Sequence, residues 1–106
     1  MKDFTHLAEN TQTAVTLLKA LANQHRLMIL CCLTNGELNV NEINCLIPIA
    51  QSSLSQHLAW LRKAEFVKTR RESQSIYYSL NSSEAISIIN VLHGLYCTES
   101  AENLLT

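Results

Sequence analysis

The 106-residue sequence lacks the patterns that mark several classes of protein. It has no apolar run near the roughly eighteen residues that are needed to cross a bilayer. Its first ten residues, MKDFTHLAEN, do not place a basic segment before an apolar one, so we expect no secretory signal and a cytoplasmic protein. There are no repeats and no linker, and the length predicts a single domain over residues 1–106.

The cysteines also lack a familiar spacing. The chain contains no CxxC and no HxxxH, so no zinc module is indicated, and no helix begins with the CxxC of a thiol oxidoreductase. We therefore expect neither an enzyme nor a cofactor. In a reducing compartment, free thiols more often serve catalysis, metal binding or sensing than structural disulfides. Four such thiols are present, namely Cys31, Cys32, Cys45 and Cys97.

Only 16% of the residues are charged, and the net charge is −1. Neither value by itself indicates a nucleic-acid binder. The distribution is uneven, because five of the eight Lys and Arg residues fall between Arg62 and Arg71, opposed only by Glu65. Such a strip can bind phosphate locally, although charge alone favours a merely solvated face. The apolar fraction of 47% is high for so small a domain, so we expect some apolar surface to be covered by a partner chain.

Hydrophobic periodicity predicts the order helix, helix, short helix, helix, hairpin, helix. The helices are expected in residues 14–22, 23–37, 40–50, 51–64 and 82–97, and the strands in 66–71 and 76–80. Asn23 and either Ser82 or Ser83 are predicted N-caps, and Pro48 stops the short helix. The prediction is a mainly α fold with one β-hairpin (α+β), in the order of a winged helix-turn-helix.

The helix in residues 51–64 has one apolar and one polar face. Stepping 100° per residue places Leu54, Leu58 and Leu61 on the buried side. Short hydroxyl and amide groups on the other side suit contacts with base edges and phosphates, although serines also cap ordinary amphipathic helices. The side chains predicted to point outward are Ser52, Ser53, Gln56, Trp60 and Lys63.

The hairpin that follows favours DNA binding over the ordinary helix. Ile76, Tyr78 and Leu80 alternate inward, whereas Lys68 and Arg70 share one face of the partner strand. A basic hairpin with a polar tip, directly after a helix with a basic end, can straddle a phosphate backbone.

The segment QSSLSQHLAWLRKAEFVKTRRESQSIYYSL, with the preceding LKALANQHRLMIL, resembles the ArsR/SmtB-type winged-helix repressors of bacteria. The resemblance covers residues 14–97 and implies a homodimer that joins through its first and last helices and binds a dyad-symmetric operator. It implies a reading face in the major groove, with His57 at the groove edge, and a basic wing. The residues carried over are Gln51, Ser52, Ser53, Ser55, Gln56 and His57 on the helix and Lys68, Arg70 and Gln74 on the wing.

Many members of this family bind metal, but the resemblance does not extend to their ligands. One family site uses two cysteines in an ELCVCDL-like segment, where this chain reads ELNVNEI and has Asn39 and Asn41. Neutral amides are poor ligands for soft metals. A second family site uses Asp and His on the last helix, where this chain has only His93 with Glu84 and Glu99 at unmatched spacing. No metal site is predicted; an atypical site of thiols with His6, His25 or His93 remains the alternative.

A thiol-sensing branch of the family, which includes a biofilm repressor and a haemolysin regulator, is more similar. RLMILC places one of its cysteines at Cys31, and LYC places the other at Cys97. The resemblance implies a sensor of reactive sulfur species, persulfides or oxidants. Its redox-sensing pair would form an intrasubunit disulfide or polysulfide link that lowers operator affinity.

Helical geometry gives a partial independent test of that pairing. Cys31 falls near the margin of the apolar stripe, whereas Cys32 is predicted to point away beside Met28, so a bridge between these neighbours is unfavourable. Cys97 is predicted to share a side with His93, away from Leu92. Cys32 and Cys45 are expected to be inert small apolar residues.

Overall fold

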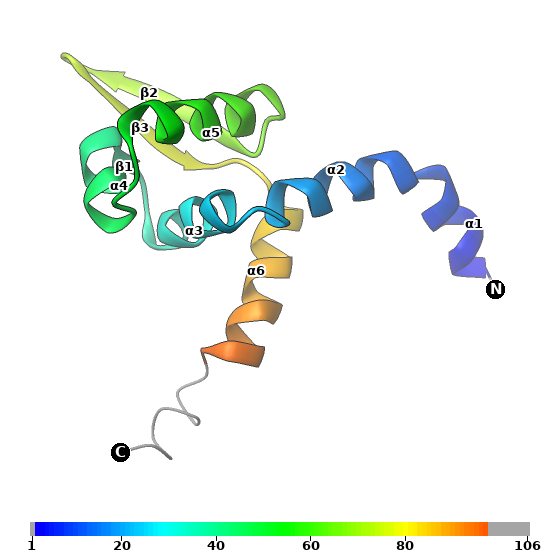
Figure 1. Ribbon diagram of the computed structural model, residues 1–106. Coiled ribbons are helices and arrows are strands. Elements are labelled where there is room, and N and C mark those ends of the chain that lie inside the picture. The colour runs from blue at the N-terminus through cyan, green and yellow to red at the C-terminus, as the bar shows by residue number, and fades with distance from the viewer. Residues whose placement is uncertain (1, 98–106) are drawn as a thin grey trace, which may run out of the picture.

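The computed structural model describes residues 2–97, in which six helices and three short strands follow one another (Figure 1). The helices are α1 (Lys2–Glu9), α2 (Thr11–Leu21), α3 (Gln24–Cys32), α4 (Val40–Leu46), α5 (Gln51–Lys63) and α6 (Ser83–Tyr96). The strands are β1 (Leu38–Asn39), β2 (Val67–Glu72) and β3 (Ser75–Leu80), and a 3-10 turn (Leu33–Asn35) ends α3.

The strands form one antiparallel sheet in the order β1-β3-β2, with Leu38 opposite Tyr78 and Val67 opposite Leu80. The mainly helical winged-helix fold predicted from the sequence is confirmed. Two elements were not predicted, namely α1 and β1. Helix α1 buries no apolar stripe, since Phe4 and Leu7 are both exposed, and β1 is too short to show an alternating pattern.

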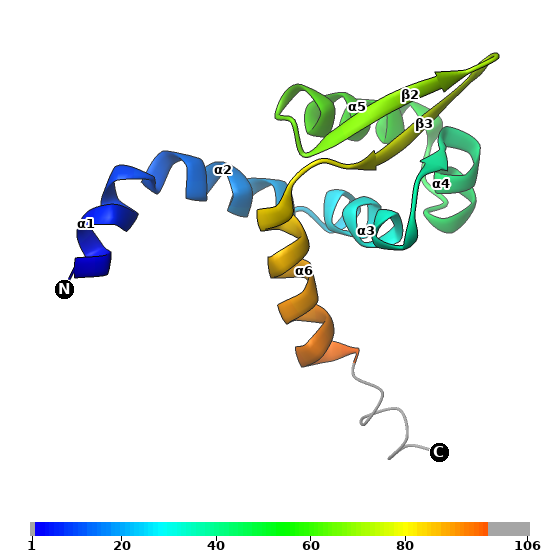
Figure 2. The ribbon, with the colours of Figure 1, turned by 180° about the vertical axis from the view of Figure 1, so that it is seen from behind.

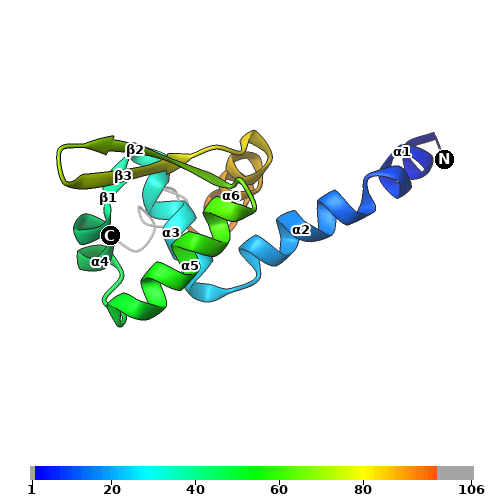
Figure 3. The same ribbon diagram turned by 90° about the horizontal axis from the view of Figure 1, so that it is seen from above.

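The hydrophobic core lies between α3, α5 and the sheet, with further residues from α2, α4 and α6. Helices α3 and α5 run beside each other in Figure 3. The predicted buried face of α5 is confirmed, because Leu54, Leu58 and Leu61 are each at most 1% exposed. Ile29 and Leu30 of α3 pack in the same cluster. The i, i+4, i+7 spacing of the three α5 leucines therefore fixes which side of that helix is left for solvent.

Side-chain caps define where three of the helices begin. Asn23 accepts a hydrogen bond from the Arg26 N–H (3.1 Å), and Ser82 accepts one from the Ala85 N–H (3.1 Å), as predicted. Helix α4 begins with a full capping box, in which Asn39 accepts from the Glu42 N–H and Glu42 accepts from the Asn39 N–H. These caps satisfy N–H groups that no helix can satisfy internally.

Helices α1, α2 and α6 extend away from the core in two directions (Figures 1 and 2). Eight of the ten large apolar side chains that the structure exposes lie on these helices, namely Phe4, Leu7, Val15, Leu18, Ile86, Val91, Leu95 and Tyr96. Exposed apolar side chains in this number are typical of surfaces that another chain covers. Within residues 2–97, no helix combines the length and the apolar character that a membrane span requires.

Replacing Asn39 with alanine should lower the free energy of unfolding by about 1 kcal/mol, because the mutation removes the cap of α4. Asn41→Ala is the matched control, since Asn41 is exposed on the same helix and caps nothing. Chemical denaturation of both variants measures the difference. Equal losses of stability in the two variants would contradict the assignment of Asn39 as the cap.

Candidate DNA-reading face and thiol groove

The first turn of α5 carries the predicted reading residues on its surface. Gln51, Ser52, Ser55 and Gln56 are exposed, and Ser53 is half-buried. The N-cap of this helix is Ala50, whose side chain makes no capping hydrogen bond. The serines of α5 therefore do not serve as its cap, and the free N–H groups of the first turn suit an approaching phosphate.

His57 is half-buried and lies next to α3. Its ring is 5.7 Å from that of His25 on α3, with the two planes tilted by 53°. Burial, together with the charges of Arg26 and His25, lowers the pKa of His57. The imidazole is consequently held in its neutral form at neutral pH, which suits hydrogen bonding better than charge pairing.

Trp60 was expected to point outward, and this expectation is wrong. The indole is half-buried and lies parallel to the ring of Phe66, with centroids 6.3 Å apart and an interplanar angle of 2°. The Arg26 guanidinium covers the indole at 4.2 Å from its centroid. Trp60 therefore ties the end of α5 to the start of the wing rather than facing DNA.

The wing is formed by β2 and β3, and its tip is the turn at Ser73 and Gln74. Lys68 and Arg70 share the outer face as predicted, opposite Ser79 and Tyr77 of β3. Lys68 and Gln74 are exposed. Gln74 also borders a small groove that separates the wing tip from the start of α4.

Arg70 differs from the other wing residues because its guanidinium already has partners. Its Nη2 lies 2.6 Å and its Nε 3.2 Å from the two Glu37 carboxylate oxygens, and its Nη1 lies 3.1 Å from Glu72. The hydrogen bonds from Arg70 lower the pKa of Glu37, and those to Glu37 and Glu72 raise the pKa of Arg70. Both shifts favour the charged forms of Arg70 and Glu37.

Cys31 and Cys97 line one groove, which has a volume of about 560 Å³ and lies between α3, α4 and α6. Both thiols are free and exposed. Much of the wall is apolar, and Met28 and Leu46, two large exposed apolar residues outside α1, α2 and α6, border it. The structure therefore brings the predicted redox pair to a common apolar surface, together with His93.

Cys32 does not point away from the core, contrary to the helical-wheel expectation. It is half-buried against the core, and its Sγ donates a hydrogen bond to the Ile29 carbonyl (3.1 Å). Leu92 was expected on the side away from Cys97, yet it lines the same groove. The buried side of α3 includes Ile29 as well as Leu30, and it therefore extends to Cys32, three residues after Ile29.

Burial controls the reactivity of the two neighbouring thiols. Burial, and secondarily the nearby Cys97, raise the pKa of Cys31. Burial raises the pKa of Cys32 to about 11, with a smaller contribution from Cys31. Since the thiolate is the nucleophile, both cysteines are less reactive than an ordinary thiol at neutral pH, and Cys32 is held in the protonated form.

The residues at the two metal-site positions do not fit a metal. Asn39 is committed to the cap of α4, and Asn41 is exposed on that helix. Within the described part of the chain, no group of three His, Cys, Asp or Glu side chains could hold an ion. Glu99, considered with His93 and Glu84, lies outside the described residues.

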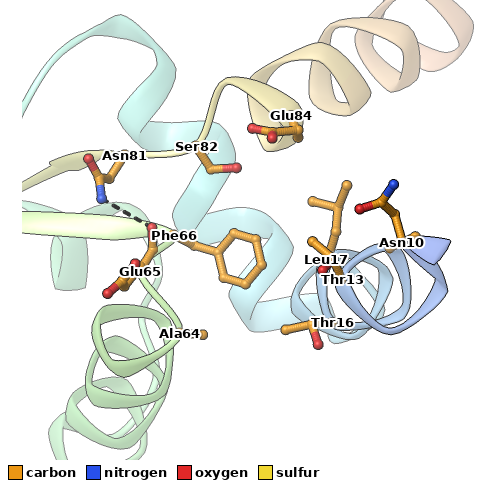
Figure 4. A pocket seen from close by; sticks show the side chains of 11 residues that line it. Asn10, Thr13, Thr16, Leu17, Ala64, Glu65, Phe66, Asn81, Ser82 and Glu84 are labelled. Carbon is orange, nitrogen blue, oxygen red and sulfur yellow. Dashed lines mark hydrogen bonds between the residues drawn. The ribbon is translucent and has the colours of Figure 1, made fainter. Parts of the chain in front are cut away.

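A second hollow, of about 630 Å³, lies between α2, the turn after α5 and the start of α6 (Figure 4). It contains no cysteine and none of the predicted reading residues. Its wall contains two carboxylates, those of Glu65 and Glu84, and otherwise uncharged side chains such as Phe66 and Leu17. Its two carboxylates make it unsuitable for an anion such as phosphate.

Comparisons with known proteins match this architecture. A family model described as bacterial regulatory protein, arsR family, matches residues 23–69. The transcriptional activator HlyU of Vibrio cholerae is 50% identical over 91 residues, which are 86% of this chain and 84% of HlyU. The chain belongs to the ArsR family of bacterial regulatory proteins.

Solved structures of ArsR-family proteins agree with this assignment. Reduced HlyU from Vibrio cholerae has a TM-score of 0.83 at 48% identity, with 88% of this chain and 98% of that chain covered. The transcriptional repressor BigR from Xylella fastidiosa also has a TM-score of 0.83, at 35% identity, with 89% and 96% covered. This ArsR-family chain is thus a DNA-binding transcriptional regulator and not an enzyme, as predicted.

At pH 8 the native chain should be alkylated at Cys32 about a hundredfold more slowly than the urea-unfolded chain, because a pKa of about 11 leaves little thiolate. The rate should then rise about tenfold per pH unit up to that value. Mass spectrometry of iodoacetamide-treated peptides measures both rates. A native rate at Cys32 close to the unfolded rate would show that the thiol is not shielded.

Proposed function

We propose that this ArsR-family regulator is a cytoplasmic homodimeric repressor that senses reactive sulfur species or oxidants through Cys31 and Cys97. In the reduced state the dimer binds a dyad-symmetric double-stranded operator. A covalent link between the two thiols then lowers operator affinity. Residues 1–106 act as one DNA-binding and dimerisation domain in this proposal.

The exposed apolar surface supports the dimer. The eight large apolar side chains on α1, α2 and α6 are exposed in the described chain, and a second copy would cover them. Two copies joined through these helices would hold their α5 helices at a fixed separation. Such a separation must match the spacing of the operator half-sites.

The uncapped, exposed first turn of α5 supports the reading face. We propose base-edge contacts from short hydroxyl and amide groups, and phosphate contacts from the wing. The proposed contacts are Gln51, Ser52, Ser53, Ser55, Gln56 and His57 on α5 and Lys68 and Gln74 on the wing. Arg70 was predicted with them, but its guanidinium is occupied by the carboxylates of Glu37 and Glu72.

The observation that carries the sensing proposal is the shared groove of Cys31 and Cys97. The groove is open to solvent, so a small effector can enter it. Among the relatives, HlyU has been solved in a form described as reduced, which supports redox chemistry in that regulator and, by similarity, in this one.

A persulfide, RSSH, can serve as the oxidant that converts the two thiols into a disulfide. We propose that Cys97 attacks first, since the raised pKa of Cys31 disfavours its thiolate. Cys97 takes the outer sulfur from RSSH and releases RSH. Cys31 then attacks the Cys97 Sγ and displaces H₂S, leaving a disulfide. A second sulfur transfer before closure gives a polysulfide link, and with peroxide the corresponding intermediate is a sulfenic acid that releases water.

The link would act on DNA binding through α3. That helix packs against α5 in the core and forms one wall of the thiol groove, whereas Cys97 ends α6. Tying α3 to the end of α6 changes the angle between the reading helix and the dimer-forming helices. Operator affinity falls because the half-site spacing no longer matches.

A metal-responsive regulator with a thiol–His site is the second candidate, since His93 lines the same groove as the two thiols. The described residues lack three donors close enough for an ion, so we favour the sulfur sensor. Titration of the operator complex with zinc or copper(I) separates the candidates. Release at stoichiometric metal would favour the metal sensor.

Gln56→Ala should weaken specific operator binding by about ten- to a hundredfold, because a lost base contact costs roughly 1–3 kcal/mol, and should leave non-specific binding intact. Asn35→Ala is the control, because Asn35 is exposed in the 3-10 turn after α3 and belongs neither to the proposed DNA contacts nor to a helix of the proposed dimer. Fluorescence anisotropy with an operator selected by the wild-type chain measures both. An unchanged specificity ratio in Gln56→Ala would remove this residue from the reading face.

Cys31→Ser and Cys97→Ser should each bind the operator when reduced but should no longer be released by a persulfide donor. Cys45→Ser is the matched control, because Cys45 is an exposed thiol that does not line the groove. Mass spectrometry of the treated wild-type chain should detect a linked pair of peptides carrying Cys31 and Cys97. Release without such a link, or normal release of either groove variant, would refute the switch.

A further inference from the structure

Arg70 spans the whole width of the sheet. From β2 its side chain crosses the ring of Tyr77 on β3, with the guanidinium carbon 4.8 Å from the ring centroid. It ends on the carboxylate of Glu37, immediately before β1. The contact is bidentate, through Nε and Nη2, which is the strongest geometry for an arginine–carboxylate pair.

The strand register explains why these groups meet. Arg70 is opposite Tyr77, and Tyr77 is opposite Asn39, so the three form one row across β2, β3 and β1. Opposite residues in an antiparallel sheet project to the same face. Glu37 precedes Asn39 by two residues and reaches the same row.

The charges around Arg70 are unfavourable for a phosphate contact. Glu37 occupies one edge of the guanidinium, and Glu72 takes a hydrogen bond from Nη1 at 3.1 Å. One positive group with two negative groups gives the cluster a net charge of −1. A phosphate would have to displace a bidentate carboxylate and would meet a second one beside it.

The cluster has a direct connection to the helix-turn-helix. Strand β1 runs without a break into the capping box of α4, in which Asn39 is the N-cap. Helix α4 leads through the turn at residues 47–50 into the reading helix α5. A bond between β2 and the start of β1 therefore fixes the angle between the wing and the helix-turn-helix.

We infer that Arg70 is a positioning residue, which clamps the wing to the start of the helix-turn-helix through Glu37 and Tyr77 instead of binding phosphate. This inference rests on the proposed DNA-binding face and assigns its wing contacts to Lys68 and Gln74. The opposing mechanism is that Glu37 merely holds Arg70 away from DNA until a phosphate replaces it. The two mechanisms predict opposite effects of removing the Glu37 charge.

The test compares Glu37→Gln with Glu72→Gln. Each variant removes one carboxylate charge from the same guanidinium, but only Glu37→Gln breaks the bond across the sheet. A positioning role predicts that Glu37→Gln weakens operator binding about two- to fivefold, whereas Glu72→Gln binds no more weakly than wild type. Tighter binding by Glu37→Gln than by Glu72→Gln would overturn the inference.

The salt dependence of operator binding distinguishes a phosphate contact at Arg70 from a positioning role, because only a phosphate contact contributes to it. A phosphate contact at Arg70 would make the slope of log K against log salt concentration smaller by about 0.9 in Arg70→Gln, whereas a clamp leaves the slope unchanged. Arg70→Lys keeps the charge but cannot form the fork, so a clamp predicts that it binds as weakly as Arg70→Gln. Recovery of wild-type affinity in Arg70→Lys would overturn the inference.

Anisotropy titrations at several salt concentrations, on the operator selected by the wild-type chain from random duplexes, supply all of these values. If the wild-type chain selects no duplex, both the proposed function and this inference fail. If it selects one and the order of the two glutamate variants is reversed, only the inference fails.

Discussion

The burial of α3 is the constraint on which both candidate sites depend. Ile29 and Leu30 pack with the α5 leucines and so fix the reading helix in place. The same helix presents Cys31 to the groove that it shares with α6. The core residues Ile29 and Leu30 and the groove residues Met28 and Cys31 alternate within the same stretch of this nine-residue helix. A change on its groove side must therefore be accommodated either by its core packing or by its neighbours, and dense cores resist the first.

The sequence was sufficient to predict the parts of the fold that depend on periodicity within one element. The leucine spacing of α5, the cap Asn23 and a cap at Ser82 or Ser83 were predicted from neighbouring residues alone. Each is confirmed, with Ser82 as the cap of α6. The errors concern side chains whose surroundings come from elsewhere in the chain. Trp60 lies on the polar side of an ideal wheel, but Phe66 and Arg26 cover it. Cys32 was misplaced because the buried side of α3 includes Ile29 as well as Leu30 and extends to Cys32.

Two functional features had no signal in any single segment. Glu37 and Tyr77 were not predicted to matter, because their relation to Arg70 depends on the pairing of β1 with β3, and a two-residue strand has no pattern to detect. The apolar rim of the thiol groove was also missed, since Met28 and Leu46 belong to different helices. Knowing which wing residues pair with residues 37–39 would have indicated the contact of Arg70 with Glu37 and Tyr77.

The apolar surfaces of α1, α2 and α6 have a consequence for how the regulator works at low abundance. In the proposed dimer, each chain obtains part of its buried apolar area from its partner, so folding and association are linked through concentration. Occupancy of a two-half-site operator then rises with the square of the free chain concentration while monomers predominate. A modest change in the number of chains per cell would therefore act as a threshold on gene expression, independently of any effector.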